Sequence, residues 1–371
     1  MKKILFLIHD LGIGGAEKVL VNLVNHLDPE KFSVTVIALF GGGVNEQFLK
    51  KTVRYRSIFS RTFPGNSHIM KLFSPGMLHK LFIKEKYDIE VAYLEGPSAR
   101  IISGCPHQDT KLISWIHSEQ HPPEVAAGAF RNFFESQKCY SHFDEIVCVS
   151  EYIKNDFLSI YPDIRNVRVL YNTNETSQII KQKDDPVEEG LFREGELKVC
   201  FVGKVVKSKG IDRVARIFLR LRNEGIPVHF YILGIGPEQE HIETEIKAHE
   251  QSEYFTFLGY RNNPYKYVSR CDVFICASLS EGFSTAATEA LIVGTPVVTV
   301  DVSGMREMLG ENNEYGIVTE QNEEALYSGL KRILMTPGLL AEYKNKAKER
   351  GKIFSTKQTV SAVEHLLTNI G

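Results

Sequence analysis

Two glutamates, Glu281 and Glu289, stand eight residues apart at a position suited to binding the hydroxyl groups of a sugar. They begin and end the sequence Glu-Gly-Phe-Ser-Thr-Ala-Ala-Thr-Glu, which follows the apolar run 273–276. If a helix begins near Ser284, both carboxylates face one ligand, and the first amides of the helix add hydrogen-bond donors. Each acid also has a simpler explanation: the helix dipole favours an acid near its N-terminus, and loop acids are often solvated. The pair beside a glycine favours a ligand site.

A second cluster combines lysine with glycine. Lys204, Lys207 and Lys209 lie between Gly203 and Gly210, where an expected strand turns into an expected helix. Ammonium groups and free backbone amides at such a turn suit a diphosphate. Lysine-rich loops are more often simply solvated. The position at the carboxyl end of a strand nevertheless favours phosphate binding.

A glycine-rich turn follows the first apolar run of the chain. Gly12, Gly14 and Gly15 precede a helical pattern, so backbone amides there can approach a phosphate or a sugar. The spacing is G-x-G-G rather than G-x-G-x-x-G, and the second strand ends at Gly41 without an acid for a ribose. A dinucleotide site, and with it a dehydrogenase, therefore fits poorly. A tight turn without a ligand is the alternative, and we expect a ligand-facing loop.

His117 follows another apolar run, 111–115, which contains the only tryptophan. A histidine at the end of a strand can point into a binding site. A lone histidine is more often structural, and Glu119 or His121 could satisfy it locally. His117 is therefore a candidate sugar contact with a structural alternative.

These residues need strands and helices to position them, and short apolar runs alternate with helical patterns along the chain. Continuous apolar runs are typical of a parallel sheet covered on both faces, which indicates a doubly wound α/β fold. The expected strands are 4–8, 33–39, 89–94, 111–115, 145–149, 167–170, 198–202, 228–233, 255–258, 273–276 and 296–300.

The segment 174–196 interrupts this alternation, because it is polar and has little apolar periodicity. We therefore predict two tandem Rossmann-like domains, 1–173 and 197–355, joined by a linker over 174–196 and followed by a helical segment, 356–371. Ligands of such sheets bind beyond the carboxyl ends of the strands, so two facing domains imply an interdomain cleft.

The overall composition excludes several classes of protein. The 371 residues are 43% hydrophobic, which is enough for packed cores, and 44 basic against 46 acidic residues argue against nucleic-acid binding. Six cysteines without a CxxC pair or zinc-site spacing indicate neither disulfides nor a structural zinc site. The first apolar run is too short for a signal peptide, and none is long enough to span a bilayer. The expected location is the cytoplasm.

Together these motifs resemble the retaining glycosyltransferases of the GT-B fold, in glycosyltransferase family 4, also called group 1. The resemblance covers nearly the whole chain. It rests on the order and spacing of Gly14-Gly15-Ala-Glu17, Val202-Gly203-Lys204 with Lys209-Gly210, Gly234-Ile-Gly236-Pro-Glu238, Glu281 with Glu289, and Gly294-Thr-Pro296.

The resemblance implies a role for each candidate residue. Glu289 would bind the ribose of a nucleotide sugar, Glu281 and the amides after it the donor sugar, and Lys204 and Lys209 the diphosphate. Lys204 stands where the family usually has arginine, so it makes a point contact rather than a fork. His117 would contact the sugar, and the terminal helix would cross back to the first, acceptor-binding domain. The full set of implied site residues is Gly14, Gly15, His117, Gly203, Lys204, Lys209, Glu281, Gly282, Phe283, Ser284, Thr285 and Glu289.

The implied reaction transfers a sugar from a nucleotide sugar, expected to be a UDP-sugar, to a glycan or polyprenyl-linked acceptor in cell-surface polysaccharide synthesis. The resemblance implies no cofactor and no metal, and the sequence contains no Asp-x-Asp. A non-catalytic nucleotide-sugar-binding module of the same fold is the main alternative. An epimerase or phosphorylase of this architecture is another, although a phosphorylase usually needs a longer chain with a pyridoxal-bearing lysine.

One segment of the first domain is strongly basic. Between Glu46 and Lys86 there are nine basic and two acidic residues, interleaved with aromatic residues. Each lysine or arginine near an anionic membrane contributes about 1 kcal/mol, so this segment predicts peripheral attachment at the inner face of the membrane. An ordinary solvated helix face with buried aromatics is the alternative.

Overall fold

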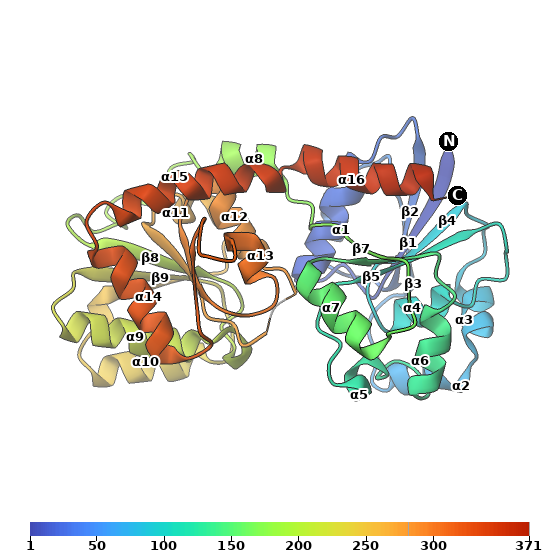
Figure 1. Ribbon diagram of the computed structural model, residues 1–371, viewed down its shortest axis with the longest axis horizontal. Coiled ribbons are helices and arrows are strands. Elements are labelled where there is room, and N and C mark those ends of the chain that lie inside the picture. Colours follow the sequence, from blue (N-terminus) through green and yellow to red (C-terminus); the bar gives the residue numbers. More distant parts are fainter. Residues whose placement is uncertain (281, 371) are drawn as a thin grey trace. The chain divides into compact units, whose positions relative to one another are not determined.

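The computed structural model describes residues 1–280 and 282–370, and for Ser67 the backbone alone. It divides into two compact units, 1–174 with 356–371 and 175–355 (Figure 1). Segment 174–196, expected as a linker, contains α8 (Thr176–Gln182), and from Glu175 on it belongs to the second unit, where α8 packs against two other helices. Among the described residues, no helix is both long and apolar enough to cross a membrane.

The first unit is built on a parallel sheet with strand order β3-β2-β1-β4-β5-β6-β7. The strands are β1 (Lys2–Ile8), β2 (Phe32–Phe40), β3 (Arg54–Phe59), β4 (Ile89–Ala92), β5 (Lys111–Ile116), β6 (Glu145–Cys148) and β7 (Val167–Val169). The helices are α1 (Gly15–His26), α2 (Asn66–Leu72), α3 (Pro75–Phe82), α4 (Pro97–Ile102), α5 (Pro123–Ala126), α6 (Phe133–Tyr140), α7 (Glu151–Ile160) and α16 (Thr356–Asn369). The central strands are buried on both faces, as their apolar sequences predict.

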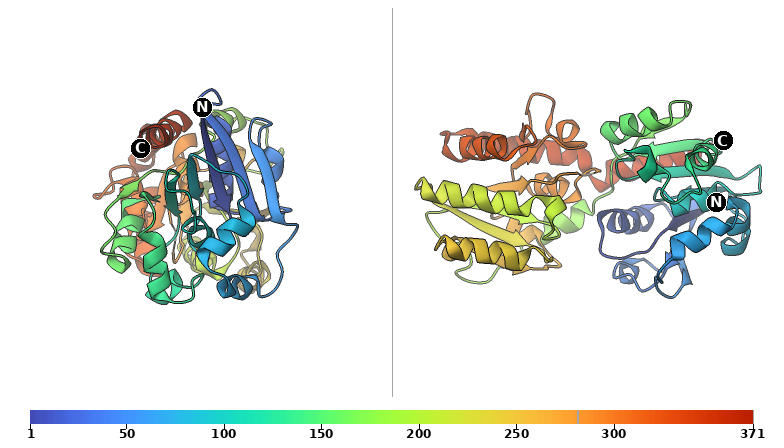
Figure 2. Two further views of the ribbon diagram at one scale, coloured as in Figure 1. Left: turned by 90° about the vertical axis from the view of Figure 1, so that its right-hand side faces the viewer. Right: turned by 90° about the horizontal axis from the view of Figure 1, so that it is seen from below.

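Helix α16 belongs to the first unit although it is the last element of the chain. Its buried residues Val360, Val363 and Leu367 follow helical spacing, and it packs against α1 (Figures 1 and 2). The ammonium of Lys2 donates to the carbonyl oxygens near its C-terminal end, and the Asp28 N–H donates to Glu364 at 2.8 Å. These contacts fix the end of the chain on the sheet that begins it.

The second unit has a parallel sheet with strand order β10-β9-β8-β11-β12-β13. The strands are β8 (Leu197–Val202), β9 (Val228–Leu233), β10 (Phe255–Gly259), β11 (Val273–Cys276), β12 (Val297–Val300) and β13 (Ile317–Thr319). Besides α8, the helices are α9 (Ile211–Asn223), α10 (Gln239–Ala248), α11 (Tyr265–Val268), α12 (Thr285–Val293), α13 (Met305–Leu309), α14 (Glu323–Met335) and α15 (Leu339–Gly351). Helices α9, α10 and α14 cover one face, and α8, α11, α12 and α15 the other (Figure 1).

The order of the second sheet determines where a ligand site can form. The chain runs from β8 outward to β9 and β10, then returns to β11 on the other side of β8. Crossovers therefore leave β8 and β11 towards opposite faces. Loops that follow two such strands diverge, and this is the place where open α/β sheets bind ligands.

Candidate functional site

The lysine loop after β8 and the loop after β11 are joined by hydrogen bonds in the second unit. The Leu279 N–H donates to the carbonyl oxygen of Ser208 at 2.8 Å. Arg213, in the first turn of α9, donates from Nη2 to the carbonyl oxygens of Ala277 and Ser278, the latter at 3.2 Å. The structure thus brings together the two motifs that the sequence nominated separately, and Arg213 is a connecting residue that sequence reasoning missed.

Gly210 is the residue that allows these two loops to approach. Its φ of +64° is left-handed, and a Cβ built there would lie 2.0 Å from the carbonyl oxygen of Ala277. Any side chain would push the loops apart, and the left-handed conformation is costly for other residues. The glycine predicted next to the diphosphate lysines therefore has a steric role in forming the site.

A third loop, after β9, supports the lysine loop from its other side. The Gly203 N–H donates to the Leu233 oxygen at 2.9 Å, and the Val205 N–H to the Ile235 oxygen at 3.0 Å. The Glu238 N–H in turn donates to the Val205 oxygen at 3.1 Å. The loops after β9 and β11, which are the two neighbours of β8 in the sheet, thus hold the lysine loop from both sides and fix its backbone.

The lysines of this loop differ in exposure. Lys204 is exposed, whereas Lys209 is half-buried at the end of a 3-10 turn (Lys207–Lys209) directly before Gly210. A partly buried ammonium interacts more strongly with a bound anion than an exposed one, because water screens it less. Both side chains are suited to phosphate oxygens, and Lys209 is the stronger candidate.

Helix α12 carries the remaining candidates that the structure describes. Ser284 caps it, since its Oγ accepts the Ala287 N–H at 3.4 Å, and Thr285 is its first residue. Gly282 precedes the cap and is half-buried, whereas Phe283 is buried with its ring 5.7 Å from that of Phe354. Glu281, which the sequence nominates as a sugar contact, lies outside the described residues.

Glu289 is a buried acid on α12 rather than a solvated charge. Glu289 is only 8% exposed, and its Oε1 accepts a hydrogen bond from the hydroxyl of Tyr265 at 3.2 Å. A buried carboxylate is costly unless a donor is hydrogen-bonded to it, and the Tyr265 hydroxyl is a donor of this kind. Tyr265, from α11, holds the carboxylate in place and was not found from the sequence.

In the first unit, the loop after β1 is shaped by its own acids. His9 Nδ1 lies 2.7 Å from Asp10 Oδ2, and Asp10 Oδ1 accepts the Gly12 N–H at 2.7 Å. Gly14 caps α1 in an extended conformation, and a Cβ there would lie 2.0 Å from the Glu17 carboxylate. Gly14 and Gly15 are therefore at the helix N-terminus, as predicted, with Glu17 folded over the first of them.

His117 lies at the carboxyl end of β5 with a polar atom buried. Within the described chain, its Nε2 is buried and has no hydrogen-bond partner. Burial lowers the pKa of His117 to about 3, opposed by a hydrogen bond to the Tyr93 backbone. The ring is therefore neutral at pH 7. With Nδ1 donating to that backbone, Nε2 is left as an acceptor for a hydroxyl group.

Glu95 holds the segment that carries His117. It follows β4, accepts the His117 N–H at 3.0 Å, and also accepts the hydroxyl of Ser118. Burial raises the pKa of Glu95, although these hydrogen bonds oppose the shift. An acid directly after a predicted strand was the available signal, but its partners lie more than twenty residues further along the chain.

Two family models match almost the entire chain. The model described as glycosyltransferase family 4 matches residues 13–178, and the model described as glycosyl transferases group 1 matches residues 182–350. The chain belongs to the GT-B glycosyltransferases. The resemblance read from the motifs is thereby confirmed, and so is the GT-B fold with two parallel-sheet α/β units.

Named relatives of this glycosyltransferase extend over its full length. It is 29% identical over 99% of the chain and 100% of the relative to N-acetylgalactosamine-N,N'-diacetylbacillosaminyl-diphospho-undecaprenol 4-alpha-N-acetylgalactosaminyltransferase of Campylobacter jejuni. An uncharacterized glycosyltransferase of Haemophilus influenzae is 22% identical over 99% of the chain and all of its own length.

Solved structures share the fold at lower identity. Anabaena HepE in complex with UDP superposes with a TM-score of 0.78 at 17% identity and covers 99% of both chains. The lipopolysaccharide outer core galactosyltransferase WaaB superposes with a TM-score of 0.75 at 16% identity, also over 99% of both chains.

Proposed function

We propose that this glycosyltransferase transfers a hexosamine or related hexose from a UDP-sugar to a polyprenyl-diphosphate-linked glycan, with retention at the anomeric carbon. It would act in cell-surface polysaccharide synthesis without a metal or cofactor. One observation carries the proposal: the lysine loop and the loop that leads into α12 are hydrogen-bonded to each other at the ends of β8 and β11. Cations and helix amides thus converge at one sheet edge.

The donor would bind to the second unit. Lys209 and Lys204 would hold the diphosphate, with Gly203 letting the loop approach it. The buried Glu289 would accept hydrogen bonds from the ribose hydroxyls, for which a carboxylate with two acceptor oxygens is suited. The amides around Gly282, Phe283, Ser284 and Thr285, with Glu281, would contact the sugar.

The reaction needs stabilisation of the departing nucleoside diphosphate. Two ammonium groups and a helix N-terminus supply the positive charge that a divalent cation provides in other enzymes. The C1–O bond to the diphosphate would break as the acceptor hydroxyl attacks from the same face, with its proton passing to the leaving phosphate oxygen. This path needs no protein nucleophile. His117, neutral at pH 7, would orient a sugar hydroxyl through Nε2.

The acceptor class is suggested by the Campylobacter jejuni relative. Its name specifies an acceptor linked through diphosphate to undecaprenol and an α-linked product. Formation of an α-linked product from an α-linked UDP-sugar is retention. The UDP bound in HepE supports uracil as the base of the donor nucleotide.

A panel of nucleotide sugars tests the proposal directly. The full chain is incubated with UDP-, GDP-, dTDP- and ADP-sugars and a synthetic polyprenyl-diphosphate saccharide, with and without EDTA. We expect transfer from a UDP-sugar that EDTA leaves unchanged, and an α-configured product by NMR. Donor binding without turnover would favour the non-catalytic module, and a β-linked product would reject retention. Absence of nucleotide-sugar binding would reject both the glycosyltransferase and the binding module.

Glu289→Gln is expected to weaken donor binding more than it slows turnover. A hydrogen bond to a charged group contributes about 1.5–3 kcal/mol, so KM for the UDP-sugar should rise by roughly 10- to 100-fold. Steady-state kinetics with varied donor measure this rise. Glu240→Gln, an exposed acid on α10, is the matched control and should keep the wild-type KM. Equal KM values for both variants would contradict the ribose assignment.

The basic segment 46–86 has a narrower membrane-facing part than its sequence suggested. Arg54 pairs with Glu85 and Lys86 with Asp109, so their charges are partly balanced. Several of its aromatic residues pack against each other rather than facing solvent: Phe59, Phe63 and Phe82, together with Phe40 of β2. These rings pack together beside β2 and β3, in the way that the alternative of an ordinary helix face with buried aromatics expects.

What remains exposed is concentrated on helices α2 and α3. We call this surface the α2–α3 face. Residues 61–84 include no acid. The face combines exposed apolar side chains with basic ones: Ile69, Leu72, Phe73, Met77 and Leu81 with Lys71, Lys80 and Lys84. Leu72 is 76% exposed and Met77 57%, which is unusual for side chains of this size on adjacent helices. Apolar and basic residues together favour an anionic lipid surface as the partner.

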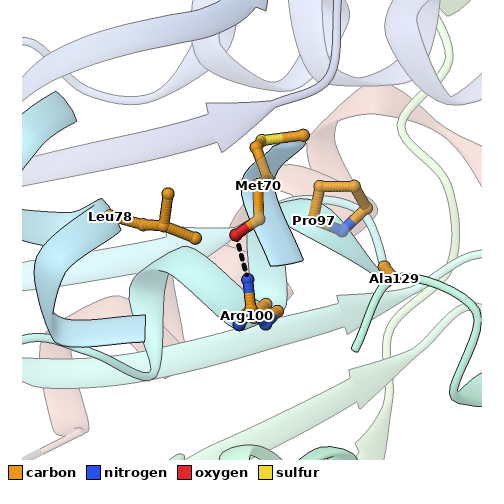
Figure 3. Close-up of a pocket in the computed structure, with 5 residues that line it drawn as sticks. All are labelled: Met70, Leu78, Pro97, Arg100 and Ala129. Carbon is orange, nitrogen blue, oxygen red and sulfur yellow. Dashed lines mark hydrogen bonds between the residues drawn. The ribbon is translucent and has the colours of Figure 1, made fainter. Parts of the chain in front are cut away.

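Two arginines hold the base of the α2–α3 face. Arg100 donates to the carbonyl oxygens of Met70 and Phe73, beside a small pocket lined by Met70, Leu78, Pro97, Arg100 and Ala129 (Figure 3). Arg131 donates to those of Lys71 and Leu72. These bonds satisfy carbonyl groups at the C-terminal end of α2, so the backbone is fixed while its apolar side chains point outward.

Leu72→Ser with Leu81→Ser is expected to lower binding to anionic vesicles. Loss of two inserted leucines should weaken binding by at least about tenfold, at 1–2 kcal/mol for each side chain. Sedimentation with phosphatidylglycerol-containing vesicles measures binding, which should also fall with salt. Met335→Ser, which removes a 51% exposed methionine of α14, is the control. Equal wild-type binding to neutral vesicles, or none at all, would reject membrane attachment.

A further inference from the structure

The first unit contains a buried group of three potential metal ligands away from the donor loops. His79 of α3, Glu90 of β4 and Cys105, just after α4, place one nitrogen, one oxygen and one sulfur atom within 4.8 Å of one another. Within the described part of the chain, this is the one such group. Glu90 is fully buried and His79 is 2% exposed, whereas Cys105 is half-buried, so the group opens to solvent only beside the thiol.

The carboxylate of Glu90 is incompletely satisfied. Its Oε2 lies 2.8 Å from His79 Nε2, but Oε1 is buried and receives no hydrogen bond from a nitrogen or oxygen of the described chain. The neighbouring thiol of Cys105 is at most a weak donor. A buried carboxylate oxygen without a strong donor is costly, and a cation bound beside Oε1 would satisfy it.

The backbone around this group is rigid enough to present ligands. Glu90 pairs with Leu5 of β1 on one side and Leu112 of β5 on the other, so its Cα is fixed in the middle of the sheet. Close beside Cys105, Thr110 donates to the Tyr87 oxygen at 2.7 Å and fixes the loop that returns to β5. Three separate elements therefore converge on a point that the sheet holds in place.

We propose that His79, Glu90 and Cys105 bind a zinc-class dication that clamps α3 and the loop after α4 to the sheet. Imidazole, carboxylate and thiolate are the ligands that Zn²⁺ takes, whereas Mg²⁺ and Ca²⁺ prefer oxygen alone. Water from the solvent side of Cys105 completes the fourth position. On binding, the Cys105 thiol releases its proton to solvent, and His79 Nε2 gives up the proton that it shares with Glu90 as the ring takes the Nδ1–H tautomer. The metal then gives both Glu90 oxygens and His79 Nε2 a positive partner.

The role of this metal is structural rather than catalytic. Helix α3 carries His79 on its inner side and Met77, Lys80 and Leu81 of the α2–α3 face on its outer side. A bound metal would thus stabilise the helix that carries the proposed membrane contact. The transfer reaction does not depend on it, and the site stands whether or not the proposed donor chemistry is right.

Cobalt titration of untagged, chelator-treated full-length protein tests the site. We expect one equivalent of Co²⁺ to bind with a thiolate-to-cobalt charge-transfer band, and one equivalent of Zn²⁺ to remain after gel filtration. Cys105→Ser should lose the band and weaken binding by about tenfold or more. Cys139→Ser, which changes a buried cysteine of the same unit, should keep the charge-transfer band and the wild-type metal affinity.

Two results would overturn the proposal. The first is wild-type protein that shows no charge-transfer band and retains no metal, and it needs no variant to fold. The second is a band that persists in Cys105→Ser, because the thiolate would then come from another cysteine. Fluorescence of Trp115, buried in β5 of the same unit, shows whether each variant is folded and whether Zn²⁺ stabilises that unit against urea.

Discussion

Replacement of Lys209 by alanine is expected to lower kcat/KM for the UDP-sugar by roughly 100-fold or more, because groups that stabilise developing charge typically contribute two to three orders of magnitude. Lys209 is half-buried beside Gly210, in the loop that is hydrogen-bonded to the segment before α12. In the proposed reaction, a positive charge in that position would act on the diphosphate as the C1–O bond breaks. The effect should therefore be larger on kcat than on KM.

A series of lysine variants separates this role from a general loss of charge. Lys204→Ala should have a smaller effect than Lys209→Ala, since Lys204 is exposed and its charge is screened by water. Lys209→Arg should retain part of the activity because it keeps the charge. Lys247→Ala, on the exposed side of α10, removes the same charge elsewhere and should match the wild type. Wild-type turnover in Lys209→Ala would reject the diphosphate assignment.

Most of the fold could be predicted because the strands of a parallel sheet covered on both faces have continuous apolar sequences. The eleven expected strands all occur, with boundaries shifted by a few residues at most. The two missed strands, β3 and β13, lie at sheet edges. β3 reads Arg-Tyr-Arg-Ser-Ile-Phe, where Arg54 pairs with Glu85 and Arg56 donates to the Phe82 carbonyl oxygen, whereas β13 has three residues. An edge strand has one neighbour and need not be apolar throughout.

The placement of the candidate residues was predictable where it follows directly from a strand end. Gly203, Lys204 and Lys209 were expected in the loop after β8, and the start of α12 was expected near Ser284. The supporting residues were not, because their roles depend on partners far along the chain. Arg213 reaches a carbonyl 64 residues away in sequence.

The buried group of His79, Glu90 and Cys105 was also missed because its members are far apart in the sequence. Zinc-site patterns place ligands a few residues apart in pairs, and the cysteines show no such spacing. His79 and Glu90 are 11 residues apart in sequence, and Cys105 follows after a further helix. The sheet and two helices bring these side chains together, so the expectation that the chain lacks a structural zinc site followed from local spacing alone.

Arg100→Met is expected to destabilise the first unit by about 3–5 kcal/mol, the usual cost of removing one partner of a buried ion pair. Arg100 is 1% exposed and makes a two-pronged contact to Glu135, with nitrogen–oxygen distances of 3.0 and 3.1 Å. It also donates to the carbonyl oxygen of Met70 at 2.8 Å (Figure 3) and to that of Phe73 at 2.7 Å. Methionine fills the volume but leaves the carboxylate and both carbonyls without these donors.

Acid should reduce the difference between this variant and the wild type. Burial raises the pKa of Glu135, but hydrogen bonds from Arg100 and from the Arg131 N–H outweigh it and hold the pKa below its usual value. A pKa that is lower in the folded state gives stability that is complete above the unfolded-state pKa. That stability is lost as the pH falls through the folded-state pKa. The gap between Arg100→Met and wild type is therefore full at pH 7 and narrows in acid.

Urea unfolding followed by the fluorescence of Trp115 measures this loss in the first unit alone, because Trp115 is the only tryptophan and lies in β5. Arg131→Met is the matched control. Its side chain is 45% exposed and also donates to α2 carbonyls, so we expect a loss of at most about 1 kcal/mol. Adding Glu135→Leu to Arg100→Met should recover part of the stability, since no unpaired charge then remains buried. Equal midpoints for Arg100→Met and Arg131→Met would show that the buried pair does not anchor α2.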